Sequence, residues 1–469
     1  MTTALPRLSR SLPAAPPAAP IKIVHLGLGN FHRAHQAWYT AHAPDASAWG
    51  IAAFTGRRPD TALALAPQNG LYTLIVKDPG GDRLELLGAI SAVHPTGDQA
   101  AYLDYLRRTE VALLTLTVTE AAYLADGAGG LRRTPEVEQD LDSLRRDPTV
   151  PVGTVPARLV AGLLARRAAA AGPITILSCD NLPDNGAVTA GVVTAFAAEL
   201  DPSLLDWIGD HVDFASSMVD RITPATTVAD RELVQRQERY DDAAPVATEP
   251  FHEWIMSGSF PAGRPRWEDA GAQIVADVTP FEQRKLWLLN GSHSLLAYAG
   301  SVRGHDSIDG AIADPACRGW VEAWWDEAAR HLPLPAADIA AYRAALLDRY
   351  ANPRIRHRLA QIAADGSTKI VVRFLPVLRA ERATGRLPVG GATAIAGWIW
   401  HLRGRGAPVN DPGAAAYLAV VDADDQSAVQ AVLELLDPGL GEDAELVALV
   451  VERLAVVAEQ VVAEQGKVG

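Results

Sequence analysis

The sequence predicts an α/β protein in which an N-terminal Rossmann-like dinucleotide-binding domain is followed by a mainly α-helical C-terminal domain. The apolar residues 21–26 run directly into a glycine turn, and later apolar runs alternate with helical patterns, as in a buried parallel sheet. Toward the C-terminus, strand patterns give way to helical periodicity, and 469 residues are long for one core. We expect a flexible N-terminal arm over residues 1–20, the dinucleotide-binding domain with insertions over 21–279 and the helical domain over 280–469.

The composition is typical of a globular protein, with 48% apolar and 21% charged residues. A net charge of -14 argues against nucleic acid or an anionic membrane as a partner. Cys179 and Cys317 show no metal-ligand spacing, so we expect neither a metal nor a disulfide framework. The proline-broken arm does not look like a signal peptide, and no apolar run reaches about 20 residues, which favours the cytoplasm. We also expect a monomer rather than a large oligomer.

The glycine turn is the first candidate site. Gly27 and Gly29 follow the first strand, and the helix that begins with Asn30 and Phe31 would face a pyrophosphate with its N-terminus. The pattern departs from G-x-G-x-x-G because His32 replaces the third glycine. We expect all five residues to contribute to a dinucleotide site.

The second predicted strand, residues 49–55, ends without the Asp or Glu that usually binds the ribose hydroxyls of NAD. Arg57 and Arg58 follow instead; they can accept the 2′-phosphate of NADP, or they are solvated loop charges. Both alternatives stay open, with NAD as the expected cofactor and NADP as possible. Residues 71–76 and 84–90 then predict a hairpin inserted in the nucleotide-binding core.

Two later strands should carry cofactor residues at their carboxyl ends. Residues 111–120 form a continuous apolar strand with a polar end, where Thr117 and Glu120 should border the cofactor. Residues 174–178 form another strand and run into a polar loop that contains Asn181. Ligands bind at the carboxyl ends of strands in an open α/β sheet, so we expect Asn181 at the same site.

Residues 281–298 predict a helix on which an amine, an imidazole and an amide share a face. At about 100° per residue, Lys285, His293 and Asn290 fall near 0°, 80° and 140°. Glu282 falls near 60° by the same rule. A lysine whose pKa is lowered by burial can accept a proton from an alcohol, and neutral donors beside it stabilise the charged oxygen. The alternative is an amphipathic helix whose polar residues form its wet face.

The rest of the chain predicts a mainly helical domain. The lysine helix begins this domain, and small ligands favour clefts between domains. Helical periodicity is present at residues 320–331, 336–350, 353–364, 391–402, 427–436 and 442–464.

Three separated stretches agree with one family: the glycine turn at 27–36, the polar loop at 178–186 and the set Lys285, Asn290 and His293. In this order and spacing they resemble the polyol-specific long-chain dehydrogenases, the family of mannitol dehydrogenase and fructuronate reductase. The resemblance implies an NAD(P)-dependent, zinc-independent enzyme that interconverts a secondary alcohol of an open-chain sugar derivative and its ketone.

The resemblance also implies a role for each site residue. Lys285 would be the general base, while Asn290 and His293 would hold the reacting oxygen. Glu282 would lie on the proton route from the lysine to solvent. The residues that would bind the substrate are Asn181, Asp220 and Lys369.

One departure bears on the substrate. Mannitol-type members place an arginine eight residues before the lysine of Asp-Gly-Ser-x-Lys, where this chain has Gln361. The segment looks more like the fructuronate reductase branch, whose carboxylate-bearing substrate needs a cation; Lys369, Arg373 and Arg358 are candidates, or exposed charges. We expect D-mannonate and D-fructuronate, with D-mannitol and D-fructose or another polyol such as arabinitol as the alternative. The non-enzyme alternative is a nucleotide-binding sensor without turnover.

Overall fold

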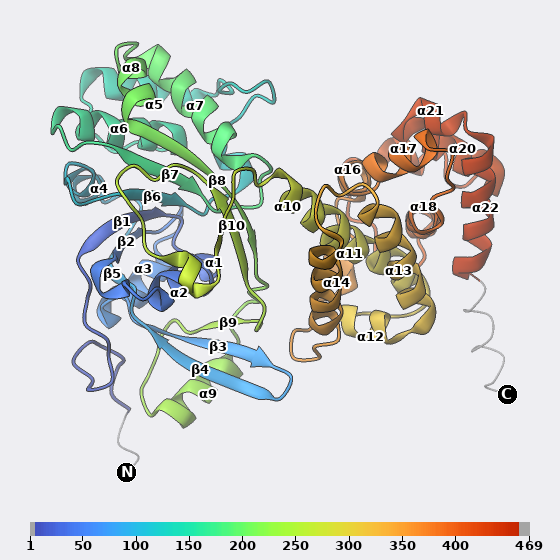
Figure 1. Cartoon of the computed structure of the whole chain (residues 1–469), viewed down its shortest axis with the longest axis horizontal. Coiled ribbons are helices and arrows are strands. Elements are labelled where there is room, and N and C mark those ends of the chain that lie inside the picture. The colour runs from blue at the N-terminus through green and yellow to red at the C-terminus, as the bar shows by residue number, and fades with distance from the viewer. Residues whose placement is uncertain (1–4, 459–469) are drawn as a thin grey trace. The chain divides into compact units, whose positions relative to one another are not determined.

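The computed structural model describes residues 5–458. The chain divides into two compact units, with the division between Thr279 and Pro280. The first contains the β-sheets and the second is helical, and they are called here the sheet unit and the helical unit (Figure 1).

The sheet unit contains an eight-stranded sheet made of β1 (Ile21–Leu26), β2 (Gly50–Phe54), β5 (Ile90–His94), β6 (Leu113–Leu116), β7 (Ile174–Ser178), β8 (Val212–Asp220), β10 (Glu253–Ser257) and β11 (Gln273–Ile274). Its spatial order is β11-β10-β8-β7-β6-β1-β2-β5. In this spatial order, all neighbouring strands between β8 and β5 pair in parallel. Strand β10 pairs antiparallel with β8. Counted along the chain, the parallel strands lie in the order 3-2-1-4-5-6, the doubly wound order of dinucleotide-binding folds. The predicted fold class is confirmed.

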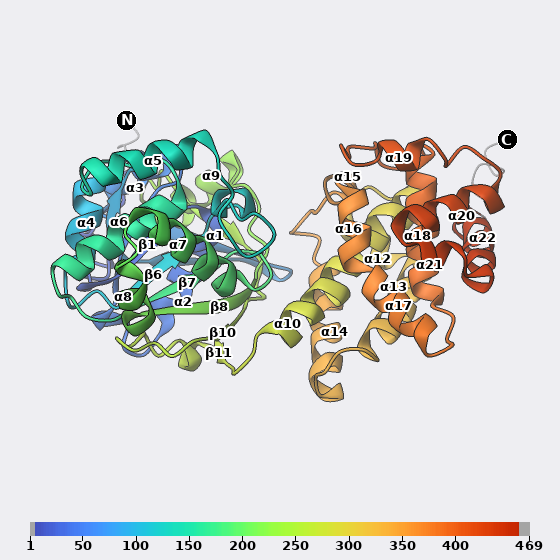
Figure 2. The same cartoon turned by 90° about the horizontal axis from the view of Figure 1, so that it is seen from above.

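Helices cover both faces of this sheet: α1 (Asn30–Ala34), α2 (Gln36–His42), α3 (Asp60–Leu65), α4 (Gln99–Leu106), α5 (Pro135–Arg146), α6 (Val155–Ala168), α7 (Asn185–Leu200) and α8 (Leu204–His211). Alternate residues of β1 enter different cores. Val24 and Leu26 pack with α4 to α8, of which α5, α6 and α7 lie side by side (Figure 2), while Ile23 packs with α1, α2 and α3. Burial on both faces explains why these strands are continuously apolar.

The predicted hairpin is formed by β3 (Tyr72–Asp78) and β4 (Gly81–Leu87), which join β9 (Val246–Thr248) in a separate three-stranded sheet. The predicted second strand, residues 84–90, is wrong at its end, because β4 stops at Leu87 and Ile90 begins β5 in the main sheet. Gly88 lies at the break, where a Cβ would come 2.4 Å from Cγ of Pro16. The close approach of Pro16 leaves no room for a side chain at residue 88.

The N-terminal segment packs against the sheet unit. Leu8 is fully buried in a small core with Val234 of α9 (Val228–Glu238), and its N–H donates to the carbonyl of Asp241 (2.9 Å). The guanidinium of Arg10 donates to the carbonyls of Gly88 (2.9 Å) and Ile90 (2.8 Å). The prediction of a flexible arm therefore does not hold for residues 5–20.

The helical unit begins with α10 (Thr279–Arg284), the π-helical segment Lys285–Gly291, α11 (Ser292–Leu295) and a second π-helical segment, Leu296–Gly300. The almost entirely buried α18 (Val389–Leu402) packs against α13 (Pro315–Ala329) and α22 (Ala444–Ala458). The remaining helices are α12 (Ile308–Ala313), α13 (Pro315–Ala329), α14 (Ala336–Tyr350), α15 (Leu359–Ile362), α16 (Gly366–Arg373), α17 (Leu375–Ala383), α18 (Val389–Leu402), α19 (Ala415–Leu418), α20 (Asp425–Leu436), α21 (Pro438–Gly441) and α22 (Ala444–Ala458).

The helix predicted at 353–364 is mostly wrong, because only α15 forms there. The side chain of Asn352 accepts from the N–H of Arg354 (3.0 Å), a local bond that competes with helix formation. No helix was predicted where α16 and α17 lie; Pro376 is compatible with the first turn of α17. The helix predicted at 442–464 is described as far as Ala458, and its remainder lies outside the described residues.

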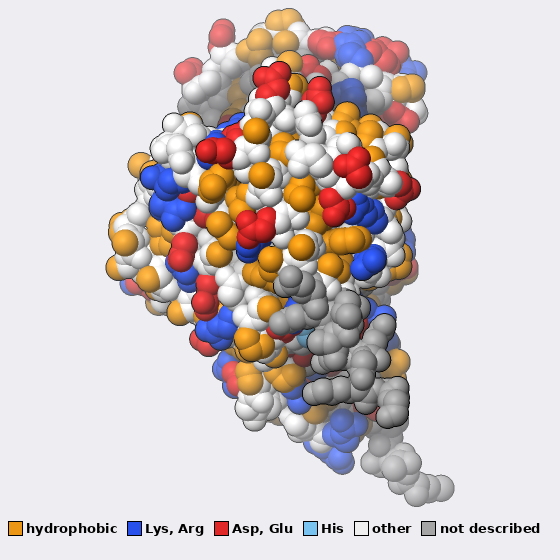
Figure 3. Space-filling model, turned by 90° about the vertical axis from the view of Figure 1, so that its right-hand side faces the viewer, with side chains coloured by type: hydrophobic (Ala, Val, Ile, Leu, Met, Phe, Trp, Pro, Cys, Tyr) orange, Lys and Arg blue, Asp and Glu red, His pale blue; other side chains and the backbone are white. Residues whose placement is uncertain are grey.

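The surface of the helical unit carries charges of both signs. On the face seen in Figure 3, red acidic and blue basic side chains are interspersed with orange apolar ones. None of the described helices has both the length and the apolar character that a membrane span requires.

Candidate functional site

A cleft of about 380 Å³ opens at the carboxyl ends of the central strands of the sheet unit. Its walls come from the segments that follow β1, β6 and β7 and from the end of β8. In an open α/β sheet, ligands bind where the strand order reverses, which here is at β1 and β6. The lining residues are Phe31, Thr117, Val118, Thr119, Glu120, Cys179, Asp180, Asn181, Leu182 and Val219.

The turn after β1 requires glycine at its first position. Gly27 has φ +107°, and a Cβ there would lie 2.0 Å from the carbonyl oxygen of Thr117. The N–H groups of Gly27 and Leu28 donate to the carbonyl of Phe54 (3.0 and 2.9 Å), which ties the turn to β2. The turn therefore lies directly against the end of β6 and holds Phe31 at the cleft.

The structure distributes the predicted cofactor residues unevenly. Phe31, Thr117, Glu120 and Asn181 line the cleft, although β6 ends at Leu116, so Thr117 and Glu120 lie in the segment that follows the strand. Gly27, Gly29 and Asn30 form the adjacent turn and the start of α1, where Oδ1 of Asn30 accepts from Nη2 of Arg33 (2.7 Å). Arg57 is exposed in the loop after β2 and does not line this cleft.

The side chain of His32 does not line the cleft, and its contribution to the cofactor site stays a prediction. The ring is fully buried and stacks on His25 of β1, with ring centroids 3.4 Å apart. Burial, followed by the nearby His25 and Arg33, keeps the pKa of His32 well below its usual range, so the ring is uncharged. The third glycine of such turns permits close packing of helix on strand. Here a flat ring stacked on a second ring fills that position.

The loop after β7 contains two residues, Asn185 and Asp180, whose structural role was not predicted. Asn185 is fully buried, and its Nδ2 donates to the carbonyls of Asp180 (3.2 Å) and Ser217 (2.8 Å), while its Oδ1 accepts from the N–H of Ser217 (3.0 Å). These bonds fix the loop that presents Asn181 to the cleft. The carboxyl of Asp180 accepts from the hydroxyl of Tyr123, and burial raises the pKa of Asp180 to about 6. Both residues belong to the polar motif, which was the available signal.

Asp220 ends β8 and is buried, with 4% of its surface exposed. The neighbouring Arg221 donates to the carbonyls of Ala34 (2.6 Å) and Glu249 (3.2 and 3.3 Å). The arginine therefore joins the end of α1 to the segment after β9.

The lysine helix forms as predicted, but not with α-helical geometry throughout. Lys285 to Gly291 are π-helical, as are Leu296 to Gly300. Because a π-helix closes i→i+5 bonds, five residues advance it by little more than one turn, against about 1.4 turns in an α-helix. The angle of about 140° between Lys285 and Asn290 is thus an overestimate, and the two residues lie closer to one face. Such segments often occur at functional sites.

Several predicted site residues of the helical unit are neighbours. Nη1 of Arg373 donates to the carbonyl of Asn290 (2.9 Å). The ring of the buried His293 lies 4.9 Å from that of Tyr350 and 5.3 Å from that of His357. Neither contact was predictable from the sequence, because both are made across the fold.

Two cationic side chains border this group. The Nζ of Lys369 donates to the carbonyls of Ile362 (3.1 Å) and Ala364 (2.6 Å). Burial and then the charge of Arg373 lower the pKa of Lys369; burial also lowers the pKa of Arg373, to about 10. Arg358, in contrast, is exposed at the start of α15. The structure thus brings Asn290, His293, Lys369 and Arg373 into one neighbourhood.

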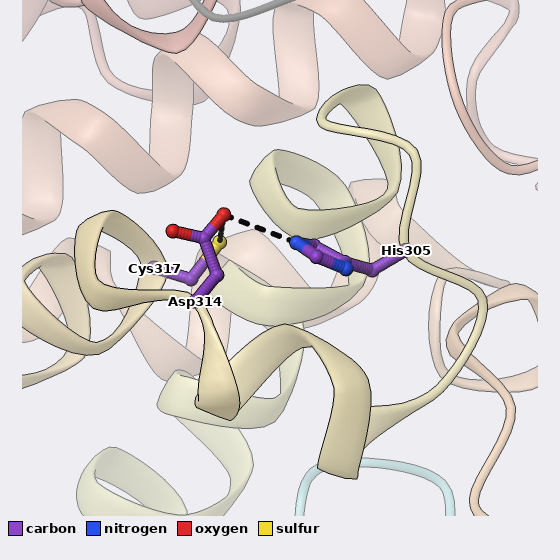
Figure 4. A group of neighbouring side chains, drawn as sticks. All are labelled: His305, Asp314 and Cys317. Atoms are coloured by element: carbon purple, nitrogen blue, oxygen red, sulfur yellow. Dashed lines mark hydrogen bonds and ion pairs between the residues drawn. The ribbon is translucent and has the colours of Figure 1, made fainter. Parts of the chain in front are cut away.

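His305, Asp314 and Cys317 form a group with the ligand types of a metal site (Figure 4). Oδ2 of Asp314 lies 3.0 Å from Nε2 of His305 and accepts from Nε of Arg303 (2.6 Å). Oδ1 of the same carboxylate caps α13 through the N–H of Ala316 (2.9 Å). Burial raises the pKa of the Cys317 thiol to about 12. A guanidinium already neutralises this carboxylate and would repel a cation, so the group stabilises the start of α13.

The sheet order, the glycine turn and the cleft define a dinucleotide-binding protein of the Rossmann type, with a second, helical unit. The chain belongs to the mannitol dehydrogenase family. The model of the mannitol dehydrogenase Rossmann domain matches residues 21–269, and that of the mannitol dehydrogenase C-terminal domain matches residues 277–458. The predicted family resemblance is confirmed.

Among the similar proteins, one is named for a sugar acid and others for a polyol. D-mannonate oxidoreductase of Escherichia coli strain K12 is 38% identical over 82% of this chain and 80% of its own. Mannitol 2-dehydrogenase of Cereibacter sphaeroides is 35% identical over 81% of each chain. The solved ternary complex of Pseudomonas fluorescens mannitol 2-dehydrogenase with NAD and D-mannitol is 33% identical, with a TM-score of 0.78, and the match covers 98% of this chain and all of that one.

Proposed function

We propose that this chain is an NAD-dependent, metal-independent oxidoreductase that interconverts D-mannonate and D-fructuronate. The family and the relatives named above support the reaction class, a CH–OH oxidation coupled to a nicotinamide cofactor. The substrate assignment goes further and rests on the charges of the helical unit.

The sheet unit has the features that NAD requires. Because Gly27 has no side chain, the turn packs directly against the backbone of Thr117. The cleft beside the turn is lined by the phenyl group of Phe31 and by the loop that contains Asn181. A turn of this kind, at the point where strand order reverses, suits a pyrophosphate and its nucleosides. Bound in this cleft, NAD would supply the acceptor for the hydride that leaves the carbon bearing the substrate hydroxyl.

The helical unit supplies the proton chemistry. Lys285 takes the proton of the hydroxyl as general base, and Glu282, one turn earlier, passes it toward solvent. Asn290 and His293 donate hydrogen bonds to the oxygen as negative charge develops on it. In the reverse direction the lysine returns the proton to the ketone oxygen. The proposal requires that these groups and the cleft of the sheet unit serve the same substrate.

One observation favours a sugar acid over a polyol: the guanidinium of Arg373 is bonded to the backbone of Asn290, and Lys369 lies close enough to Arg373 for that charge to lower the pKa of the lysine beyond the effect of burial. Two cations beside the candidate oxygen-binding residues suit a substrate carboxylate. Asn181 and Asp220 of the sheet unit would contact the remaining hydroxyls. Gln361, which is exposed, is compatible with this assignment.

A substrate panel tests the proposal directly. We expect oxidation of NADH with D-fructuronate at a kcat/KM at least tenfold above that with D-fructose, measured by the loss of NADH absorbance. The second candidate, D-mannitol and D-fructose, is supported by the Cereibacter and Pseudomonas relatives, and a reversed ratio would establish it. Absence of turnover with every hexuronate, hexulose and pentulose would contradict both and favour a nucleotide-binding sensor.

A single substitution tests the proton chemistry separately. We expect Lys285→Ala to lower kcat by about 10²–10⁴, the usual contribution of general acid–base catalysis. The dissociation constant for NADH, measured by fluorescence titration, should stay within twofold, since the lysine is not in the cofactor cleft. A wild-type kcat in this variant would remove the lysine from the mechanism.

A further inference from the structure

Four consecutive carbonyls of the π-helical segment Lys285–Gly291 accept hydrogen bonds from side chains of other helices. Trp324 and Trp325 of α13 donate through Nε1 to the carbonyls of Trp287 (2.8 Å) and Leu288 (2.9 Å). The hydroxyl of Tyr350, at the end of α14, donates to the carbonyl of Leu289 (3.2 Å). Nη1 of Arg373, at the end of α16, donates to the carbonyl of Asn290 (2.9 Å). We call these four donors the carbonyl clamp.

The donors of the clamp are held in place by burial. Trp324 is fully buried and Trp325 is 1% exposed, and a buried indole N–H needs an acceptor. Tyr350 is 2% exposed, and its hydroxyl also lies 2.8 Å from Oγ of Ser292, which itself donates to the carbonyls of Leu288 and Leu289. The packed rings therefore fix where the carbonyls must point.

Gly291 shows how closely the clamp approaches the helix. A Cβ at this position would lie 2.6 Å from Nε1 of Trp324 and 3.0 Å from Cε2 of the same ring. Any side chain at 291 would push the indole away from the carbonyl of Trp287. A glycine inside a helix lowers its stability, so its presence here is explained by the indole.

The clamp bears on the angle between the candidate catalytic residues. A π-helix is rare and occurs mostly as a single turn within an α-helix, so additional contacts are needed to keep a segment of seven residues in this geometry. Relaxation to α-helical geometry would turn Asn290 to about 140° from Lys285. It would also shift His293, whose ring lies 4.9 Å from the ring of Tyr350.

We propose that Trp324, Trp325, Tyr350 and Arg373 are positioning residues, which hold the π-helical register and thereby set Asn290 and His293 toward the same substrate oxygen as Lys285. This inference rests on the proposed function, because it assumes that Lys285, Asn290 and His293 carry the chemistry. It adds that their geometry depends on side chains of α13, α14 and α16, none of which needs to touch the substrate for this role.

Two conservative variants test the clamp. Trp325→Phe keeps an aromatic ring and removes the indole N–H, and Tyr350→Phe removes one hydroxyl. Trp400→Phe is the matched control, because Nε1 of Trp400 donates to the carbonyl of Leu454 in α22 at 3.0 Å, a bond of the same kind to an ordinary helix. We expect kcat to fall ten- to hundredfold in the first two variants, since small misplacements of catalytic groups have effects of this size. The control should stay within twofold of wild type.

Further measurements separate positioning from general loss of structure. The melting temperatures of Trp325→Phe and Trp400→Phe should fall by similar amounts, and the dissociation constant for NADH should not change in either. The acid limb of the kcat profile against pH should shift in the clamp variants only, because the surroundings of the base change. Since Tyr350→Phe retains the whole ring, it keeps the test valid if Trp325→Phe does not fold.

A double variant distinguishes failure of this inference from failure of the proposed function. In a Lys285→Ala background, Trp325→Phe should lower the remaining rate less than twofold, because residues that act as a unit are not additive. If Trp325→Phe lowers kcat by the same factor in the Lys285→Ala background as in the wild type, positioning through the lysine is overturned. If Lys285→Ala alone is inactive while Trp325→Phe and Tyr350→Phe behave like Trp400→Phe, the clamp is overturned and the function stands. If Lys285→Ala is fully active, the proposed function fails first.

Discussion

The turn after β1 and the π-helical segment Lys285–Gly291 both carry candidate chemistry, but they are held in different ways. The turn is fixed by its own backbone: Gly27 adopts φ +107°, and its N–H and that of Leu28 bond to a neighbouring strand. The π-helical segment is fixed by side chains that donate to four of its carbonyls from elsewhere in the helical unit.

The difference predicts where each region is vulnerable. A turn defined by backbone conformation should be sensitive to a single added methyl group within the turn itself. A helix defined by distant donors should be sensitive at those donors and at the residue they approach, Gly291. Substitutions that add or remove one small group can therefore distinguish local from tertiary control.

The largest effect is expected for Gly27→Ala. A Cβ would lie 2.0 Å from the oxygen of Thr117, and the positive φ disfavours any other residue. We expect a loss of roughly 2–5 kcal/mol in the free energy of unfolding, from strain and overpacking together. Denaturant unfolding measures this loss, and NADH fluorescence titration should show that affinity for the cofactor falls at least tenfold.

Gly209→Ala is the control for that variant. Gly209 lies in α8, and a Cβ there would meet no heavy atom within 4 Å. Alanine should therefore stabilise the sheet unit by about 0.5–1 kcal/mol, the usual gain within a helix. If Gly27→Ala and Gly209→Ala change the free energy of unfolding by the same amount, steric contact with Thr117 is not the cause of the destabilisation.

Gly291→Ala should have the next largest effect, and on kcat more than on stability. The added methyl would displace the indole of Trp324, whose Nε1 lies 2.6 Å from the Cβ position. We expect kcat to fall ten- to hundredfold and the free energy of unfolding to fall by roughly 1–3 kcal/mol. Gly319→Ala, in the same α13 as the indole and with open space around it, should leave kcat unchanged. Equal kcat values would contradict tertiary control of the helix.

The same contrast explains what could be predicted from the sequence. Strand, glycine turn and helix were predicted from local patterns, and the order of the sheet follows the doubly wound rule. The hairpin was predicted from two apolar runs and a turn, yet the boundary at Gly88, where Pro16 packs closely, was missed. Local signals thus gave the fold class and the position of the cleft.

Features that depend on contacts across the fold were not predictable. Nothing local distinguishes a π-helix from an α-helix at Lys285, and the side chains that donate to its carbonyls, Trp324, Trp325 and Tyr350, come from other helices. A histidine after a glycine turn resembles a cofactor residue, whereas the ring of His32 is buried by stacking on another histidine. The predicted roles of the site residues remain predictions.

A smaller effect, on the pH dependence of stability, is expected from the cleft. Burial raises the pKa of Asp180 to about 6, above its usual 3.8, so the folded state binds this proton more tightly than the unfolded state. The resulting stabilisation is complete below about pH 4 and is lost as the pH rises through about 6. Asp180→Asn keeps an acceptor for Tyr123 and removes this dependence. Relative to the variant, the wild type should lose at most about 3 kcal/mol between pH 4 and 7.

Denaturant unfolding at several pH values measures that difference. Asp206→Asn, at an exposed aspartate of α8, controls for the loss of a carboxylate from the sheet unit. If wild type and Asp180→Asn lose stability in parallel between pH 4 and 7, the proton on Asp180 does not contribute.

The smallest effect is expected for Arg57→Ala, at the exposed loop after β2. If this arginine accepts the 2′-phosphate of NADP, its loss should weaken NADPH binding roughly five- to tenfold, as expected for one charge-assisted contact near solvent. NADH binding should change less than twofold, because NADH lacks that phosphate. Arg83→Ala, an exposed arginine of β4, controls for the change in net charge. Equal effects on both cofactors would show that Arg57 is a solvated loop charge, and that the cleft alone selects the dinucleotide.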